Sequence, residues 1–234
     1  MQAVKVTLYQ NMVNYRRELS FGYVQTYPLP TPSMVRGMVH HLLGLTSYTP
    51  LKISIQGTYE SCVTNMQRII KFDRDPKSRP NNPYHVTVGT SQKTATHGVM
   101  FVDQLVNVNL TLHIDFEDPD LNQRLLQAFQ THPVILGRNE DLARVVHVEL
   151  ASIFQEEIED DIQIEKPIWM SKKTADALDL SGTYYRLPFC YETISSFEDK
   201  RLFKFVKAVY LNKGSVSSGM RYTDGKDWVD FLAP

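Results

Sequence analysis

Apolar and polar side chains alternate in several parts of the chain, and this period of two residues predicts half-buried β-strands. Residues 2–9 alternate in this way, and a second strand begins at residue 51 and extends to about residue 62. Residues 99–115 form the longest alternating run, and residues 145–150 form a further one. The polar and aromatic stretch between residues 10 and 26 is predicted to be a loop.

Two segments instead carry apolar residues at helical spacing. The first spans residues 32–43, with Thr31 as its N-cap, Pro32 in the first helical position and Gly44 as a natural stop. The second begins at the sequence Asp-Pro-Asp at 118–120 and continues with an apolar stripe to Phe129. The chain therefore contains two predicted helices, each following a predicted strand.

The entry to the first helix is stiff, because Pro28, Pro30 and Pro32 each fix φ and keep the preceding residue extended. A strand-to-helix joint of this kind holds unpaired N–H groups in a fixed place, which suits an anion such as phosphate. Arg36 and His40 lie four residues apart, on the less apolar side of the helix. The alternative is an ordinary buried helix with a stiff entry.

The predicted order is β-α-β, an insertion, and then β-α-β. This order predicts an α+β fold with a ferredoxin-like βαββαβ core, the plan that RNA-recognition domains also use. Residues 1–154 are assigned to this core domain. Residues 155–234 are predicted to be a β-rich C-terminal extension or small subdomain, with strands near 182–191 and 202–211.

Charge is distributed unevenly along the 234 residues, although the formal net charge is only −1. Residues 1–100 carry a net +7 and residues 101–166 a net −10. This polarity favours one face for a polyanion and another for protein contacts or solvent. Two distant cysteines, the lack of a signal peptide and the lack of a membrane-length apolar run favour a reducing cytoplasm.

The insertion at about 66–98 is longer than a minimal fold needs, and it is rich in basic residues. Prolines and asparagines mark its tip at 76–83, and residues 86–90 could return as a strand. A basic β-hairpin that projects from a sheet is a candidate finger for nucleic acid, because lysine and arginine neutralise phosphates. A solvated surface loop is the alternative.

A second motif, Leu-Gly-Arg-Asn-Glu-Asp, occupies residues 136–141. Gly137 permits a tight turn after the second helix, and the carboxylates of Glu140 and Asp141 could fix the guanidinium of Arg138. Taken alone, this segment also fits a local turn held by ion pairs.

The proline-rich joint, the basic insertion and the 136–141 motif together resemble the Cas-five family of CRISPR-associated proteins, and most closely its type I-B branch. Ser33 and Gly37 fit the small helix that follows the proline run in that family. Arg36 falls where smaller or apolar residues are common. The resemblance covers most of residues 1–150, and the C-terminal part matches only loosely.

The resemblance implies a non-catalytic subunit of a type I Cascade surveillance complex in antiviral defence. Such subunits bind the five-prime repeat-derived handle of the crRNA and contact the backbone subunit and the large subunit. They reach target DNA only through the assembled complex, whose guide RNA reads the sequence. The insertion would form a thumb near the junction of handle and spacer. No cofactor, metal or membrane contact is expected.

Candidate RNA contacts come from the joint, the loop before it, the insertion and the second motif: Arg16, Arg17, Phe21, Ser33, Arg36, Gly37, His40, Met66, Gln67, Arg68, Lys71, Arg74, His97 and Arg138. Candidate structural residues are those that shape the two motifs: Pro28, Pro30, Pro32, Gly137, Glu140 and Asp141.

Two other functions remain open. One is a metal-independent endoribonuclease that processes precursor crRNA, since such cleavage needs a base and an acid of the His, Lys or Tyr type. His97 with Lys93, assisted by Tyr48, would be the candidate catalytic group. The other is a ferredoxin-like protein-interaction module without any role in RNA binding.

Overall fold

A computed structural model describes residues 1–18, 20, 22–74, 85–87, 94–194 and 197–232, and it describes the side chains of these residues outside 71–97 and 193–200. The N-terminal part contains β1 (Gln2–Val13), β2 (Tyr23–Val24), α1 (Pro32–Leu43), β3 (Lys52–Thr58), β4 (Ser61–Arg74), β5 (His85–Thr87), β6 (Thr94–Asp115), α2 (Pro119–Thr131), β7 (Val134–Ile135) and β8 (Leu142–Ser152). The remainder contains β9 (Phe154–Ile158), β10 (Ile162–Ile164), β11 (Ile168–Ser171), α3 (Lys172–Ala177), β12 (Thr183–Ile194), β13 (Phe197–Leu211), β14 (Gly214–Val216), β15 (Gly219–Thr223) and β16 (Trp228–Val229).

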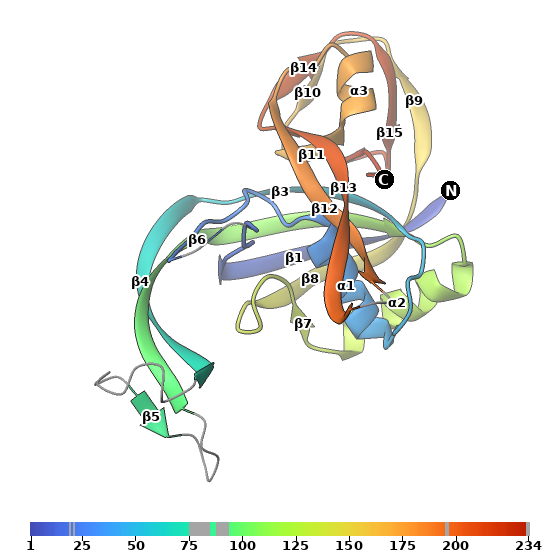
Figure 1. Cartoon of the computed structure of the whole chain (residues 1–234). Helices are drawn as coiled ribbons and strands as arrows, with labels where there is room; N and C mark the ends of the chain where they lie inside the picture. Colours follow the sequence, from blue (N-terminus) through green and yellow to red (C-terminus); the bar gives the residue numbers. More distant parts are fainter. Residues whose placement is uncertain (19, 21, 75–84, 88–93, 195–196, 233–234) are drawn as a thin grey trace.

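The central feature is a large, mainly antiparallel sheet (Figure 1). Its middle strands follow the order β8-β1-β6-β3, and every neighbouring pair in this set is antiparallel. Helix α1 connects β1 to β3, and α2 connects β6 to β8. Both helices lie on one face of the sheet, where apolar side chains of alternate strand positions form the main core. The predicted α+β, sheet-rich class is confirmed.

Local signals placed most elements correctly. Thr31 caps α1 by accepting a hydrogen bond from the backbone N–H of Met34, and Gly44 ends the helix with φ of 66°. The predicted loop over 10–26 is wrong at its start, because β1 continues to Val13 through pairing with β6. The predicted strand over 51–62 is divided into β3 and β4 by a break after Thr58.

The C-terminal strands continue the same sheet and also cover its second face. Strand β11 pairs with β3 at one position, and β13 and β12 follow β11 outward. The segments around β9, β15 and β16 lie on the face of the sheet opposite the helices (Figure 1). The sheet is therefore sandwiched between two helices and the C-terminal segments.

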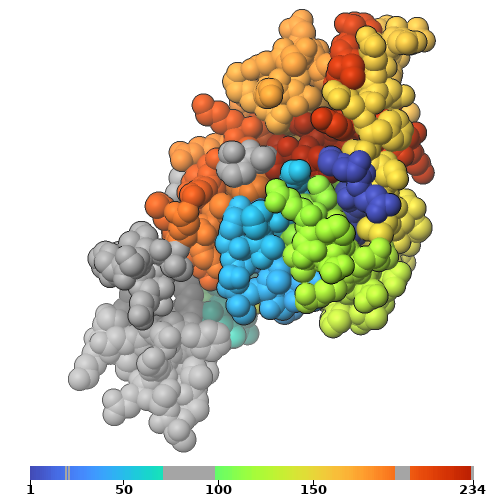
Figure 2. Space-filling view, turned by 90° about the vertical axis from the view of Figure 1, so that its right-hand side faces the viewer, coloured from blue at the N-terminus to red at the C-terminus, as the bar shows by residue number. Residues whose placement is uncertain are grey.

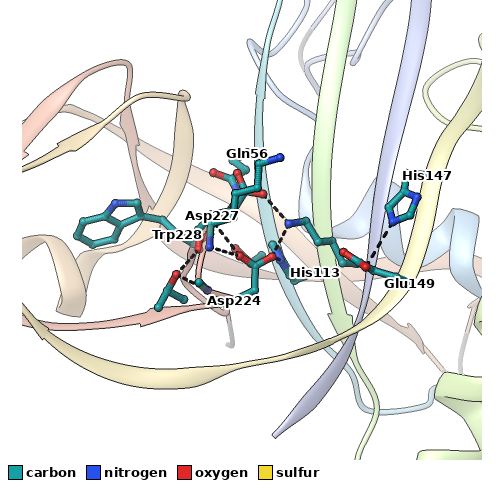
Figure 3. Close-up of polar contacts among 12 residues, drawn as sticks. Gln56, His113, His147, Glu149, Asp224, Asp227 and Trp228 are labelled. Atoms are coloured by element: carbon teal, nitrogen blue, oxygen red, sulfur yellow. Dashed lines mark hydrogen bonds and ion pairs between the residues drawn. The ribbon is translucent and has the colours of Figure 1, made fainter.

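A buried ionic cluster joins the second face of the sheet to the C-terminal segments. Lys5 of β1 lies between the carboxylates of Asp224 and Asp227, at 2.5 and 2.7 Å. Asp224 also lies 3.0 Å from Nε2 of His113 on β6, and Asp227 accepts a hydrogen bond from Lys166. Figure 3 shows the two carboxylates directed toward the sheet. Long-range ion pairs thus fix the C-terminal segments to β1 and β6.

None of the helices in the described part of the chain is long and apolar enough to cross a membrane.

Candidate nucleic-acid interface

The longest projection of the molecule is a hairpin built from β4 and β6, which extends well beyond the core (Figure 1). The two strands pair from Ser61 opposite Val106 to Arg74 opposite Thr94, and β5 pairs with the far end of β6. This is the predicted insertion, and its hairpin begins a few residues before the predicted boundary of 66.

One face of this hairpin exposes apolar side chains to an unusual degree. Met66 is 70% exposed and pairs with Phe101, which is 51% exposed, while Val99 beside it is 64% exposed. Alternation along both strands also places Arg68 and Ile70 on this side. We call this set of five residues the apolar hairpin face. Large exposed apolar patches mark interaction sites in soluble proteins.

The opposite face of the hairpin is tied to the core by polar side chains near its base. Asn65 and Gln67 of β4 both donate hydrogen bonds to Oε1 of Gln104 on β6, at 2.6 and 3.2 Å. Oε1 of Gln67 in turn accepts a hydrogen bond from the guanidinium of Arg138, at 3.0 Å. Two residues that the sequence placed in separate motifs are therefore in direct contact.

The Arg138 side chain is held by the turn that contains it. Its Nε and NH2 groups donate to the two carboxylate oxygens of Asp141 at 3.1 and 2.8 Å. Partial burial opposes the positive charge, but Asp141 outweighs this effect and raises the pKa of Arg138. Gly137 is required in this turn, because its φ is 116° and a Cβ atom would lie 2.7 Å from the Asp141 carboxylate.

Asp141 also connects the turn to the loop that precedes α1. Its Oδ2 accepts a hydrogen bond from the backbone N–H of Asn14 at 3.1 Å, and the Asn14 amide donates to the backbone oxygen of Asp103 on β6 at 2.6 Å. The carboxylate of Asp103 accepts hydrogen bonds from the hydroxyl groups of Tyr23 and Thr64. The hydrogen bond to Asp103 raises the pKa of the Tyr23 phenol. The base of the hairpin is thus held by the turn after α2 and by the segment between β1 and α1.

The loop before α1 contributes two exposed cations. Arg16 donates to the backbone oxygen of Ser20 at 3.2 Å. The guanidinium of Arg17 lies 5.5 Å from the ring centroid of Tyr27, immediately before the proline-rich joint. The predicted RNA contact Phe21 and the candidate catalytic residue Lys93 lie outside the described residues, and the same holds for the side chains of Lys71, Arg74 and His97.

The proline-rich joint is buried rather than open. Thr31 and Pro32 are buried at the first turn of α1, and the oxygen of Pro30 accepts a hydrogen bond from the Trp169 indole at 3.0 Å. A phosphate at the N-terminus of α1 would have to displace these contacts. The joint in this structure is therefore a packing element, as in the alternative reading of the sequence.

Arg36 occupies a position that the sequence did not indicate. It is only 6% exposed, and its guanidinium lies 4.8 Å from the ring centroids of both Tyr48 and Phe189. It donates to the backbone oxygens of Thr49 and Leu51, at 2.8 and 3.4 Å. Burial lowers the pKa of this group. In this arrangement Arg36 secures the segment after α1, and its contact with RNA stays a prediction.

The remaining candidates on α1 differ in exposure. Ser33 and His40 are half-buried, and burial followed by the nearby Arg36 charge lowers the pKa of His40. Gly37 is exposed, and a Cβ atom built there would meet none of the described residues within 4 Å. The chain itself therefore gives no packing reason for glycine at this position.

Sequence reasoning missed the residues that complete the apolar hairpin face and its base. Val99, Phe101 and Asp103 fall in a strand already predicted, and alternation along it could have revealed them. Tyr23 lies in the predicted loop, and only its pairing with β6 brings it to the hairpin. Within the residues that the structure describes, no group of three or more His, Cys, Asp or Glu side chains could hold a metal ion.

Comparison with known proteins identifies the family. A family described as "CRISPR-associated protein (Cas_Cas5)" matches residues 3–202. No curated protein matches the chain. A chain of a solved "CRISPR RNA-guided surveillance complex" superposes with a TM-score of 0.55 and 16% identity, covering 92% of this chain and 91% of that one. A CRISPR protein from Archaeoglobus fulgidus superposes with a TM-score of 0.50 and 13% identity, covering 100% of both chains.

At these identities the solved structures establish a shared fold, while the family match spans most of the sequence. The chain therefore belongs to the Cas5 family of CRISPR-associated proteins.

Proposed function

We propose that this chain is a non-catalytic subunit of a type I Cascade surveillance complex, of the type I-B branch, which acts in antiviral defence in the cytoplasm. In this proposal the chain binds the five-prime handle of the crRNA and contacts the backbone and large subunits. It meets target DNA only through the assembled complex. Family membership supports the CRISPR assignment, and a structurally similar chain comes from an RNA-guided surveillance complex.

The observation that carries the proposal is the apolar hairpin face. Its exposed side chains, Met66, Val99 and Phe101, sit on a hairpin braced by Arg138, so the chain keeps an apolar surface extended in a fixed direction. Exposed rings and methionines can stack on unpaired bases or insert between them, and Arg68 on the same face adds a positive charge. We also propose that β1, α1, β3, β6, α2 and β8 form a ferredoxin-like core that supports this hairpin.

The test is the retention of crRNA by the complex when the apolar hairpin face is altered. The double variant Met66→Thr/Phe101→Thr removes the two paired apolar groups while keeping side chains that favour strands. It should lose most of the crRNA that co-purifies with the tagged chain and its partner subunits. Unchanged crRNA in a folded complex would reject the role of the hairpin.

A matched control changes the same residue types at exposed strand positions elsewhere. Met220 on β15 and Phe154 on β9 are 48% and 47% exposed, and these strands lie at the opposite end of the molecule from the hairpin (Figure 1). The variant Met220→Thr/Phe154→Thr should leave crRNA retention unchanged.

The absence of catalysis is part of the same proposal and needs its own assay. Labelled repeat RNA incubated with the chain in EDTA should remain intact. A defined cut that disappears in His97→Ala would replace the proposal with the metal-independent endoribonuclease.

A further inference from the structure

A second two-stranded ribbon, formed by β12 and β13, carries an unusual alternation on one face. Lys207, Phe205, Phe203 and Arg201 occupy every second position of β13 and therefore point to the same side. Register pairs Arg186 with Lys207 and Tyr191 with Phe203, which adds an arginine and a tyrosine from β12 to this side. We call these six residues the cation–aromatic face.

Cations and rings on this face are in contact with one another. The guanidinium of Arg186 lies 4.2 Å from the ring centroid of Phe205, and that of Arg201 lies 4.6 Å from Tyr191. The rings of Tyr191 and Phe203 are 5.7 Å apart and tilted. Tyr191 is still 43% exposed and Phe203 38% exposed, so these rings keep much of their surface open to solvent.

Packing of the core does not explain these side chains. The opposite side of the same ribbon supplies the buried residues, including Leu187, Val206 and Ala208, which join the main core with the helices. The cation–aromatic face is therefore the side that the fold leaves to solvent. Figure 2 shows the ribbon, coloured orange, at one edge of the molecular surface next to the segment around α1.

The charged side chains among the six residues of this face are all positive. Among the described side chains of the ribbon, at 183–192 and 201–211, the one carboxylate is Glu192. Glu192 forms an ion pair with Lys204. These two residues directly follow Tyr191 and Phe203, and because adjacent residues of a strand point to opposite sides, they lie on the side of the ribbon away from the cation–aromatic face. Arg186, Arg201 and Lys207 thus remain as three exposed cations beside exposed rings.

We propose that the cation–aromatic face binds single-stranded nucleic acid, independently of handle recognition by the apolar hairpin face. Guanidinium and ammonium groups neutralise backbone phosphates, and exposed rings provide stacking surfaces for unpaired bases. A protein partner would have to combine carboxylates with apolar groups at this spacing, whereas every single strand presents phosphates and bases together. Phosphate contacts and ring stacking carry no sequence information, so binding through them should show no sequence preference.

The test measures binding of the purified chain to fluorescent homopolymers of about 20 nucleotides, one of RNA and one of DNA, by anisotropy over a series of salt concentrations. Homopolymers lack the repeat-derived handle, so a lack of homopolymer binding would not contradict the proposed handle binding. In the same way, a loss of handle binding would not contradict the proposal for the cation–aromatic face. Binding of either polymer through this face supports the proposal, and a preference for RNA would assign a contact to the ribose hydroxyl.

Two variants separate the charges from the rings. Arg186→Gln/Lys207→Gln should reduce the slope of log affinity against log salt by about 1.4, since each phosphate contact with a single strand contributes about 0.7. Tyr191→Leu/Phe203→Leu keeps apolar packing but removes the stacking surface, and it should weaken binding about tenfold. Urea unfolding of both variants confirms that the fold is retained.

The control variant is Lys204→Gln/Lys213→Gln, which removes the same charge from positions outside the cation–aromatic face. It should leave the affinity within about twofold of the original chain, with an unchanged salt slope. Equal losses in the control and in Arg186→Gln/Lys207→Gln would overturn the proposal, as would no binding of either polymer. Release of a protein subunit from the complex by the face variants, without an effect on homopolymers, would instead identify a protein interface and overturn it.

Discussion

The guanidinium of Arg138 donates a hydrogen bond to Oε1 of Gln67 at 3.0 Å, and thereby joins the turn after α2 to the projecting hairpin. The same guanidinium forms a fork with Asp141, which is 2% exposed. The Leu-Gly-Arg-Asn-Glu-Asp motif is thus more than a local turn held by ion pairs. It braces the hairpin against the core, and we propose that this hairpin binds RNA.

We predict that Arg138→Lys lowers the free energy of unfolding by about 2 kcal/mol, because an ammonium group cannot form the fork with Asp141 and also reach Gln67. Urea unfolding of the isolated chain measures the loss. The control is Glu140→Gln, since Glu140 is 65% exposed and its ion pair with Arg138 should contribute less than about 0.5 kcal/mol. Equal losses in the two variants would contradict the brace.

Two glycines in the predicted motifs should respond to alanine in opposite ways. Gly137→Ala should destabilise the chain by about 2 kcal/mol or more, because its φ of 116° and the nearby Asp141 carboxylate both exclude a Cβ atom. Gly37→Ala should stabilise the isolated chain by about 0.5–1 kcal/mol, since it lies in a helix with open space beside it. Thermal or urea unfolding of the two variants checks the opposite signs.

The same Gly37→Ala chain tests whether a partner approaches α1 closely. If RNA or another subunit packs against this position in the complex, the added methyl group should reduce crRNA retention even though the isolated chain is more stable. A complex that retains crRNA fully would show that Gly37 is outside the interface.

The buried ionic cluster should make stability depend on acid. Burial alone would raise the pKa of Asp224, but hydrogen bonds from His113, the backbone and Lys5 outweigh it and hold the pKa well below its ordinary value. The pKa of Asp227 is lowered as well, by hydrogen bonds from Lys166 and Lys5 that outweigh its burial. A folded-state pKa below the unfolded value contributes stability that is present above the unfolded pKa and lost as pH falls toward the folded one.

We therefore expect the free energy of unfolding to decline below about pH 5, and this decline to be flatter in Asp224→Asn. At neutral pH this variant should lose about 3 kcal/mol, because Lys5 and His113 remain buried with fewer acceptors. Urea unfolding at several pH values measures both effects. The exposed residue Asp160 supplies the control, and Asp160→Asn should leave the profile as it was.

Local periodicity predicted β1, α1 and α2, because helix and strand spacing, the Thr31 cap and the Gly44 stop depend on neighbouring residues alone. Element ends were less accurate where pairing decides them. Strand β1 passes its expected end because Val13 pairs with Leu105, nearly a hundred residues later. The presence of the hairpin was predicted from the excess of residues between two strands, although its pairing begins at Ser61 rather than at residue 66.

The contacts between distant segments could not be predicted. Lys5 and Asp224 are 219 positions apart, and no local pattern indicates that they meet. Arg36 shows the same limit more sharply. Its position on the less apolar side of a helix favoured exposure, but β12 and the segment after α1 bring Phe189 and Tyr48 over it. A strand that comes from a distant part of the sequence and packs against a helix can reverse an expectation based on periodicity.

Arg36 and Arg17 should therefore separate stability from RNA binding. Arg36→Lys should lower the free energy of unfolding by about 2 kcal/mol, because a lysine cannot stack between Tyr48 and Phe189 and donate to both backbone oxygens. Once folded, the variant should retain crRNA normally. Arg17→Gln should instead reduce crRNA retention and leave the free energy of unfolding nearly unchanged, because Arg17 is exposed beside Tyr27.

Urea unfolding of each isolated variant and quantification of crRNA per assembled complex give the two readouts. Reduced crRNA in Arg36→Lys at unchanged stability would show that this arginine leaves its buried position to contact RNA. Normal crRNA in Arg17→Gln would remove the loop before α1 from the interface. The Arg36→Lys measurement thus decides whether the helix after the proline-rich joint contacts RNA, and the Arg17→Gln measurement decides the same for the loop before it.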